Sequence, residues 1–529
     1  MNNKQLNTSF SIFIIISFAY AIFNFSWWQI YTPVVLSGMS AIHFIDIFRD
    51  GNLFYNAPLV TYIMRFMFFM FGKEYYDLII IFVNYIFFLI PLYFIYKIGV
   101  ELKDKETGNI AMILFALVPA VYGMSRQYGH QDYHIIAGIT FNIYCLIKTD
   151  YFKNKKWTIW YGISVGLGLM IKDAFLAYFF VPFVYIAIAG LREKIEKTKI
   201  INILISILIG SLIAGWHYFR PEIIIKVIKE PIIEQQPIFA FESLRVMTTG
   251  LWEELLSPPI FIIFIIGLIF FILKYKGKYK NIILLWFFVP WAIIMLMPHN
   301  KMSEYGLGFI PATVLFGAVF ISYIRREYVK KIILTIVIII GFFQYVSFSY
   351  DIYIEFFEIQ FKYKNNLIKY YDKYNPLVFY NVKESKKPLN LINRLKKDYQ
   401  NNTFYIEEFC KVDSGSIVSQ MYLNNMYCRQ GNYDNKDLLL SDIIIVIGKP
   451  KTVRKVVELK INKILENAVI SEMVTEEFIS ELLNEVDNNF NEISRQYDVI
   501  DIFYLERSKD EDTKVTLLGK KYKFFQLFE

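Results

Sequence analysis

The sequence contains little cysteine, little histidine and little charge. Three cysteines and five histidines occur among 529 residues, and Asp, Glu, Lys and Arg together make up only 20% of them. So few cysteines exclude the dense disulfide framework of small secreted domains. Cys410 and Cys428 lie close together in a polar region, and we expect them to pair if that region is extracytoplasmic.

Apolar and aromatic residues are abundant instead, at 55% and 18% of the chain. They form about eleven runs of roughly 17 to 22 residues, the length that crosses about 30 Å of hydrocarbon. The first run has no small-residue cleavage site and is longer than a signal-peptide core, so we interpret it as a retained span. The sequence therefore predicts a polytopic α-helical membrane protein with spans near 8–28, 77–97, 108–125, 133–149, 157–171, 174–191, 200–217, 258–274, 281–298, 306–324 and 331–350.

Lysine and arginine gather in short clusters between these runs, on alternate sides of successive spans. This distribution explains the net charge of +8 without a nucleic-acid partner. By the positive-inside rule the basic face is cytoplasmic, and the N-terminus lies on that side of a plasma or inner membrane. The outer face then receives the loops 29–76 and 218–257 and everything after residue 350.

The composition changes at about residue 351. Charge rises, spans stop, and short β-rich runs such as "PLVFYNV" and "DIIIVIG" alternate with helical patterns such as "TVRKVVELKINKILENA". We therefore predict a transmembrane domain over residues 1–350 and a soluble extracytoplasmic α/β domain over residues 351–529.

The predicted outer face holds an unusual set of polar residues. The first outer loop carries apolar residues at helical spacing, interrupted by "DGN" and Pro58, a pattern typical of segments that lie in the membrane plane. Farther on, "RQYGHQDYH" at 126–134 places an arginine, an aspartate and two histidines between two apolar runs. We expect the two long outer loops to roof a cavity over the spans.

Four segments occur in an order that resembles a known family: "NAPLVTYIMRFMFFMFG", "GHQDYHIIAGITFNIYCLIKT", "WYGISVGLGLMIKDAFLAYFFVPFVYIAI" and "HNKMSEYGLGFIPATVLFGA". They resemble the GT-C membrane glycosyltransferases of the protein O-mannosyltransferase and aminoarabinose-transferase type, over roughly residues 1–350. In that family a "PPL" step precedes an in-plane helix, and a short glycine-rich span ends in lysine and a small turn. This sequence has "APL" and "LGLMIKD" at those places.

The resemblance implies an inverting hexosyl or pentosyl transfer from a polyprenyl-phosphate carrier to a glycan, lipid or protein acceptor at the outer face. Such a transfer needs a carboxylate base for the acceptor hydroxyl and cationic donors for the departing lipid phosphate. The family carries an acidic residue before the "PPL" step, but this chain has Ser37 and Gly38 in that window. Asp46 and Asp50 lie nearer the proline and are the candidate substitute bases.

The same resemblance matches Asp132 to an acidic residue of the second outer loop that helps organise the acceptor and the base, so Asp132 is a third candidate catalytic residue. Alternatively, Asp132 caps the following helix and favours its dipole. Arg126 is expected either to neutralise a phosphate or to pair with Asp132. His130 and His134 are four residues apart and could bind a metal with Asp132, but a further ligand is missing, so no metal or other cofactor is predicted to be required.

Lys172 is the candidate for binding the lipid phosphate, and Asp173 is expected to pair with it or to cap the next helix. Lys301 and Tyr305 flank the last outer turn, "KMSEYG", where the family contacts donor phosphate and begins a late span with a basic-x-x-Arg-Tyr stretch. Alternatively they are a snorkelling lysine and an interfacial tyrosine.

Two other functions fit a polytopic chain with polar residues between spans. One is a transporter or flippase of lipid-linked precursors, although the sequence has no evident inverted repeat. The other is a non-catalytic scaffold that keeps the GT-C architecture, which the displaced acidic residue favours. A cavity with a carboxylate and a cation converging on it would favour the enzyme, and a through-going polar channel would favour transport.

Overall fold

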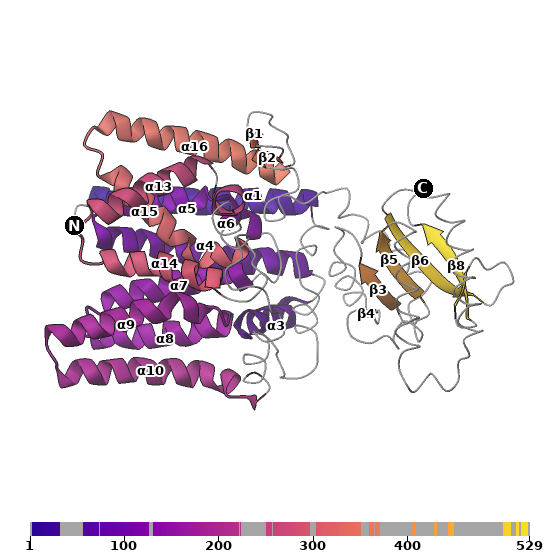
Figure 1. Ribbon diagram of the computed structural model, residues 1–529, viewed down its shortest axis with the longest axis horizontal. Coiled ribbons are helices and arrows are strands. Elements are labelled where there is room, and N and C mark those ends of the chain that lie inside the picture. The colour runs from indigo at the N-terminus through magenta and orange to yellow at the C-terminus, as the bar shows by residue number, and fades with distance from the viewer. Residues whose placement is uncertain are drawn as a thin grey trace. The chain divides into compact units, whose positions relative to one another are not determined.

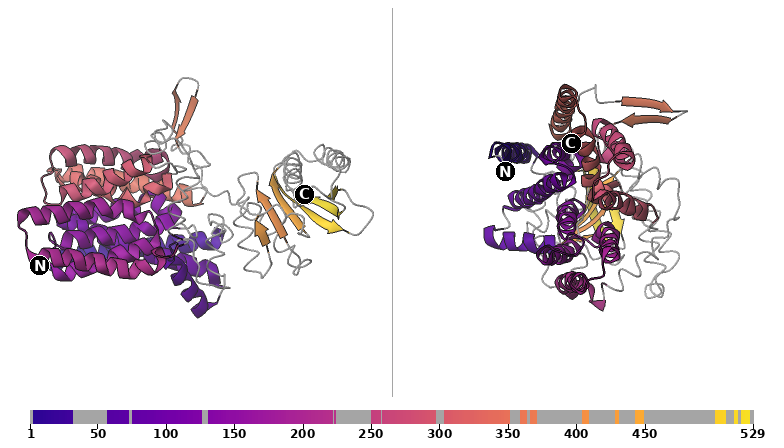
Figure 2. Two further views of the ribbon diagram at one scale, coloured as in Figure 1. Left: turned by 60° about the horizontal axis from the view of Figure 1, so that its bottom comes forward. Right: turned by 90° about the vertical axis from the view of Figure 1, so that its left-hand side faces the viewer.

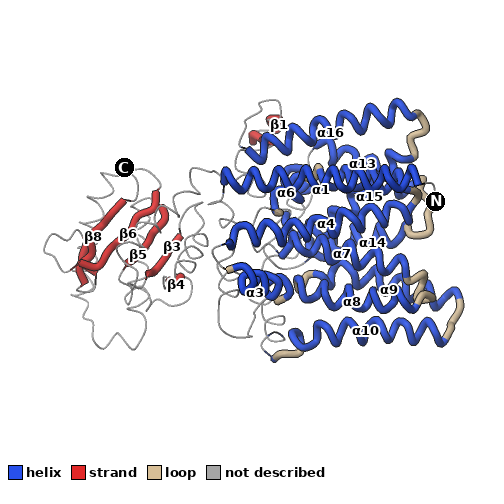
Figure 3. The backbone as a smooth tube through the Cα atoms, turned by 180° about the vertical axis from the view of Figure 1, so that it is seen from behind, coloured by secondary structure: helices blue, strands red, loops and turns tan. Residues whose placement is uncertain are grey.

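The computed structural model describes residues 3–31, 57–72, 75–125, 131–221, 223, 250–256, 258–296 and 303–350, and the strands given below. The chain divides into two compact units, residues 1–32 with 49–380 and residues 33–48 with 381–529. Helices occupy the described residues up to 350, and strands appear only after residue 358, as the blue and red segments in Figure 3 show.

The first unit is a bundle of helices whose axes lie roughly side by side (Figures 1 and 2). Its earlier helices are α1 (Asn3–Tyr31), α3 (Leu59–Phe71), α4 (Tyr76–Leu102), α5 (Lys105–Ala116), α6 (Pro119–Met124), α7 (Gln131–Lys148), α8 (Lys155–Ile171), α9 (Phe175–Glu193) and α10 (Lys197–Tyr218). Its later elements are the π-helix η3 (Leu251–Leu255), α13 (Pro258–Leu273), α14 (Lys280–Leu296), the 3-10 helix η4 (Ser303–Phe309), α15 (Ile310–Ser322) and α16 (Glu327–Tyr350). The short helix α3 runs across the direction of the others.

Within the described residues, every predicted apolar run is helical over most of its length, with two local differences. The run 108–125 is two helices, α5 and α6, because Pro119 lacks an N–H donor and starts a new helix rather than continuing the first. The run 306–324 begins as the 3-10 helix η4. By length and composition, five helices of the described residues qualify as membrane spans: Leu78–Leu102, Phe175–Glu193, Lys197–Tyr218, Tyr305–Ser322 and Glu327–Val346.

The short connections between helices are fixed by polar caps and by one unusual turn. The Asp104 carboxylate accepts a hydrogen bond from the Thr107 backbone N–H at 2.8 Å and so caps α5. The Asn154 side chain caps α8 in the same way. Between α7 and α8, residues Asp150 to Phe152 all have positive φ, from 48° to 62°. These left-handed conformations reverse the chain within a few residues, so α7 and α8 pack as antiparallel neighbours.

Glycine brings α8 and α10 into close contact. A Cβ atom at Gly162 would lie 2.7 Å from the Ser206 carbonyl oxygen, and one at Gly166 would lie 2.5 Å from the Ile213 Cβ. Small residues on one helix face allow the backbones of apolar helices to approach, which replaces the missing hydrophobic driving force in lipid. This packing fixes the end of α8, from which Lys172 extends.

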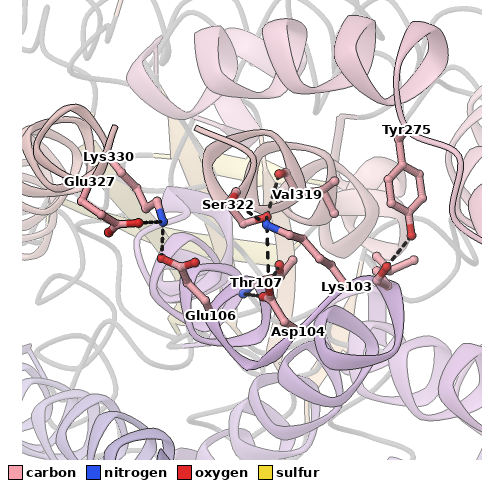
Figure 4. Close-up of polar contacts among 10 residues, drawn as sticks. Lys103, Asp104, Glu106, Thr107, Tyr275, Val319, Ser322, Glu327 and Lys330 are labelled. Carbon is pink, nitrogen blue, oxygen red and sulfur yellow. Dashed lines mark hydrogen bonds and ion pairs between the residues drawn. The ribbon is translucent and has the colours of Figure 1, made fainter. Parts of the chain in front are cut away.

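At one end of the bundle, lysine side chains form hydrogen bonds and ion pairs between helix termini. We call this the Lys103 end. The Lys103 ammonium donates to the Ser322 carbonyl at 2.5 Å and so joins the end of α4 to the end of α15. The ammonium of Lys330, which is almost fully buried, donates to Glu106 at 2.6 Å and to Glu327 at 2.9 Å. Figure 4 shows both sets of contacts. They connect α16 to α5 and satisfy charges that would be costly to leave unpaired near lipid.

The strands form a hairpin and a larger sheet. In the first unit β1 (Ile359–Tyr363) pairs antiparallel with β2 (Asn366–Tyr370). The second unit has a sheet of order β4-β3-β5-β6-β8-β7, built from β3 (Phe404–Glu408), β4 (Cys428–Gln430), β5 (Ile443–Gly448), β6 (Asp501–Ser508), β7 (Val515–Leu517) and β8 (Lys520–Gln526). Strand β3 is parallel to β4 and β5, and the remaining pairs are antiparallel. The predicted helix at 452–468 and Cys410 lie outside the described residues, so the α/β class and the Cys410–Cys428 disulfide stay predictions.

Candidate functional site

Asp132 lies in the first turn of α7, where a carboxylate favours the positive end of the helix dipole. The far end of α7 carries Lys148, which pairs with Glu101 at 3.0 Å. Sixteen residues of helix separate Asp132 from Lys148, about 24 Å along the axis. Asp132 therefore lies at the end of the bundle opposite to the Lys103 end, and we call this the Lys172 end.

Lys172 immediately follows α8 in an extended conformation, with φ −159° and ψ 142°. Its ammonium forms an ion pair with the Asp132 carboxylate, and the two side chains are only 20% and 10% exposed. The prediction that Asp173 pairs with Lys172 or caps α9 is wrong. Asp173 instead accepts a hydrogen bond from the Tyr218 hydroxyl at 2.6 Å, because the last residue of α10 lies beside the α8–α9 turn.

Tyr305, from η4, completes the group. Its ring lies 5.1 Å from the Lys172 ammonium, within cation–π range. Two buried aromatic donors hold the backbone of η4: the Tyr178 hydroxyl donates to the Tyr305 carbonyl, and the Trp286 Nε1–H donates to the Gly308 carbonyl at 2.9 Å. The position of the Tyr305 ring is thus fixed from α9 and α14.

The arrangement leaves part of the Lys172 ammonium unused. An ammonium carries three N–H donors. Within the part of the chain that the structure describes, Asp132 is the one hydrogen-bond acceptor that Lys172 contacts. A half-buried cation with remaining donors, a carboxylate partner and an aromatic ring can bind a further anion.

A buried polar network lies behind Asp132. The Asn84 side chain contacts the His134 Nε2 at 2.8 Å and donates to the Ser125 carbonyl at 2.7 Å, while the Tyr133 hydroxyl donates to the Asn84 carbonyl at 3.1 Å. His134 is fully buried in this network and faces Asn84. Among the described residues no group of three His, Cys, Asp or Glu side chains is arranged to hold a metal.

The structure therefore brings together Asp132, Lys172 and Tyr305, which are widely separated in sequence. The other predicted site residues lie outside the described residues: Asp46, Asp50, Arg126, His130 and Lys301. Sequence reasoning missed Tyr178, Trp286 and Tyr218. No pattern distinguishes these tyrosines from the other tyrosines of a chain that contains 39 of them.

Part of the chain, including two residues of this site, is similar to a known family. Residues 55–217 match the family model of dolichyl-phosphate-mannose-protein mannosyltransferases, a stretch that includes Asp132 and Lys172. The resemblance to GT-C membrane glycosyltransferases that use polyprenyl-phosphate carriers is confirmed.

Several solved structures are similar to this chain. ArnT from Cupriavidus metallidurans bound to undecaprenyl phosphate is similar with a TM-score of 0.57 and 9% identity, over 82% of this chain and 92% of that one. The same protein in the apo state gives a TM-score of 0.55 and 9% identity, over 83% and 93%. The archaeal oligosaccharyltransferase AglB from Archaeoglobus fulgidus, in complex with an inhibitory peptide and a dolichol-phosphate, gives 0.47 and 10% identity, over 83% and 69%. A comparison with curated protein sequences finds no match.

Proposed function

We propose that this protein is a membrane glycosyltransferase that moves a sugar from a polyprenyl-phosphate carrier to an acceptor at the outer face of the membrane. The observation that carries the proposal is the Lys172 ammonium, paired with Asp132 and covered by the Tyr305 ring, with N–H donors that no other acceptor among the described residues takes up. The family match over residues 55–217 and the fold shared with an ArnT bound to undecaprenyl phosphate support a lipid phosphate as that anion.

The reaction is a single displacement at the anomeric carbon of the donor sugar. The acceptor oxygen forms a bond to this carbon as the bond to the phosphate oxygen breaks, so the configuration inverts. A carboxylate takes the proton of the acceptor hydroxyl, and the lipid phosphate leaves with the bonding electron pair. The Lys172 ammonium stabilises the negative charge that grows on the departing phosphate.

Asp132 acts on Lys172 rather than on the sugar. Its carboxylate pairs with the ammonium and so holds the lysine side chain in place at the end of α8. The candidate base remains Asp46 or Asp50, as the sequence resemblance suggests. Tyr305 packs its ring against the cation and limits the water around it.

The orientation completes the proposal. Basic clusters mark the Lys103 end as cytoplasmic, so the Lys172 end faces outward and residues 351–529 form the extracytoplasmic α/β domain. The α3 helix, which runs across the bundle, lies in the outer membrane plane. The acceptor is a glycan, a lipid or a protein.

The test is Lys172→Met, which keeps the length of the side chain and removes its charge. Purified variants are assayed with undecaprenyl-phosphate-linked sugars, and melting temperatures are measured alongside. Loss of a charge-assisted hydrogen bond to the phosphate in the transition state should lower turnover about thirty- to a thousand-fold. The matched control is Lys148→Met, which breaks a lysine–carboxylate pair with Glu101 at the far end of α7, the helix that carries Asp132.

We expect the control to keep its turnover with a similar change in melting temperature. Unchanged turnover in a normally folded Lys172→Met variant would remove the lysine from the site. A wild-type protein that transfers none of the offered sugars, in a cell whose knockout has an unaltered envelope, would contradict the enzymatic function itself.

A further inference from the structure

We propose that Tyr218 is a positioning residue that holds the Asp173 carboxylate away from Lys172, so that the ammonium stays paired with Asp132 and open to a phosphate. This inference rests on the proposed function, because it concerns how the same lysine is kept available. It adds a residue of α10 to a site otherwise made by α7, α8 and η4.

Lys172 and Asp173 are neighbours in the chain, and an isolated ammonium and carboxylate in such a pair attract each other. In the structure they have different partners. Lys172 contacts the Asp132 Oδ2, and the Asp173 Oδ1 lies 2.6 Å from the Tyr218 hydroxyl. The extended backbone at Lys172 sends consecutive side chains to opposite sides, which separates the two partners.

Tyr218 is itself well held. It is the last residue of α10, a helix that is fixed against α8 through Gly162 and Gly166. Its hydroxyl also lies 2.7 Å from the Leu169 carbonyl oxygen, in the last turn of α8, where carbonyls have no partner within the helix. The single hydroxyl proton is shared between this carbonyl oxygen and the Asp173 carboxylate, so Tyr218 lies against both the end of α8 and the residue after Lys172.

The electrostatic consequence concerns the phosphate. Asp173 is partly exposed, so its carboxylate can turn toward Lys172 if the tyrosine hydroxyl is lost. A second carboxylate at the ammonium would take up a free N–H donor and would add a negative charge that repels a phosphate. Tyr218 therefore matters for anion binding through Asp173 and not through contact with the ligand.

This mechanism makes a charge-rescue experiment decisive. The full-length protein in detergent micelles is titrated with undecaprenyl phosphate, and the Kd is measured for wild type, Tyr218→Phe, Asp173→Asn and the double variant. We expect Tyr218→Phe to raise the Kd about five- to tenfold, the scale of one lost charge-assisted contact. Asp173→Asn and the double variant should both stay within about twofold of wild type, because no carboxylate is left to move.

The matched control is Tyr275→Phe. The Tyr275 hydroxyl donates to the Leu102 carbonyl at 2.6 Å, so it also closes the end of a helix, but at the Lys103 end (Figure 4). This variant should lose melting temperature like Tyr218→Phe and keep the wild-type Kd.

The outcomes are distinguishable. A Tyr218→Phe variant that binds like wild type, or a double variant as weak as Tyr218→Phe alone, overturns the positioning role and leaves Tyr218 as a helix-end contact only. A wild-type protein that binds no undecaprenyl phosphate, or that binds it as tightly after Lys172→Met, overturns the lysine's role in the proposed function and this inference with it.

Discussion

The hydroxyl of Tyr178 donates to the backbone carbonyl of Tyr305, 127 residues later in the chain. This bond joins α9 to η4, the element whose tyrosine ring covers the Lys172 ammonium. Gly308 lies against the ring of Tyr178, since a Cβ atom there would come within 2.4 Å of it. The ring that lies over the cation is therefore positioned by a buried residue of another helix, α9.

Tyr178→Phe should lower donor affinity more than turnover. The change removes one buried hydrogen-bond donor and leaves the Tyr305 carbonyl without it, at a cost of about 1 to 3 kcal/mol. We expect a several-fold rise in KM for the lipid-linked donor, because the ring no longer holds the ammonium in place. Steady-state kinetics with varied donor concentration measures this.

Asp132→Asn should destabilise the protein and weaken donor use. It leaves the Lys172 ammonium half-buried without a charged partner, at a cost of about 1 to 3 kcal/mol in folding free energy. Lys172→Met in the same background should cost less than Lys172→Met alone, because the pair is already broken. A double-mutant cycle on melting temperature measures this coupling. Strictly additive effects would contradict a functional ion pair.

Gly166→Ala should disturb the α8–α10 contact, and Gly210→Ala should be tolerated. A Cβ atom at Gly166 would lie 2.5 Å from the Ile213 Cβ, whereas one at Gly210 would lie 3.1 Å from the Val165 Cγ1, a side-chain atom that can give way. We expect a fall in melting temperature for Gly166→Ala that corresponds to about 1 to 3 kcal/mol. Equal losses of melting temperature in the two variants would show that the contact at Gly166 does not limit how closely α8 and α10 approach.

The sequence predicted much of the helical bundle because apolar length is a local property. A run of about 20 apolar residues forms a helix in lipid whatever its neighbours are. The exceptions were local too: Pro119 divides one run, and η4 begins another. Asp132, Lys172 and Tyr305 were recognisable because charged and amphipathic residues at span ends are conspicuous.

The partners of these residues were not predictable. The sequence suggested Asp173 as the partner of Lys172, because the two are adjacent, yet the structure pairs Lys172 with a residue 40 positions earlier and Asp173 with one 45 positions later. Such pairings depend on how α7, α8 and α10 pack. That packing depends on glycine contacts between helices. The sequence shows where the glycines are, but not which helices they bring together.

The turn after α7 should give a small, pH-dependent contribution to stability. The hydrogen bond from the Lys278 ammonium, at 2.6 Å, lowers the pKa of Asp150 and outweighs the opposing effect of burial, while Asp150 raises the pKa of Lys278. A depressed carboxyl pKa stabilises the fold above the ordinary value of about 3.9, and this stabilisation is lost as the pH falls through the lowered pKa.

Lys278→Met should therefore cost about 0.2 to 1 kcal/mol near neutral pH, since the pair is half exposed, and almost nothing once the pH has fallen below the lowered pKa of Asp150. Melting temperatures of the two proteins, measured from pH 8 down to the most acidic pH at which both still fold, give the difference. The control is Lys276→Met, at an exposed lysine of the same turn, which should change nothing at any pH. A constant difference between wild type and Lys278→Met down to the lowest pH would rule out the ion pair as its source.

The topology can be tested with the chain's own cysteines. Of the three cysteines, Cys145 is buried in α7. A membrane-impermeant maleimide, applied to intact cells after disulfides have been reduced, therefore reports on Cys410 and Cys428. If residues 351–529 are extracytoplasmic, Cys428 should be labelled without lysis, and Cys410→Ser/Cys428→Ser should abolish the signal. Adding Lys278→Cys to that double variant provides the opposite control, because its turn joins α13 to α14 on the predicted cytoplasmic side and its side chain is 50% exposed. That cysteine should react only after lysis. The reverse pattern would invert the membrane orientation and would place the Lys172 end, with its ion pair, in the cytoplasm.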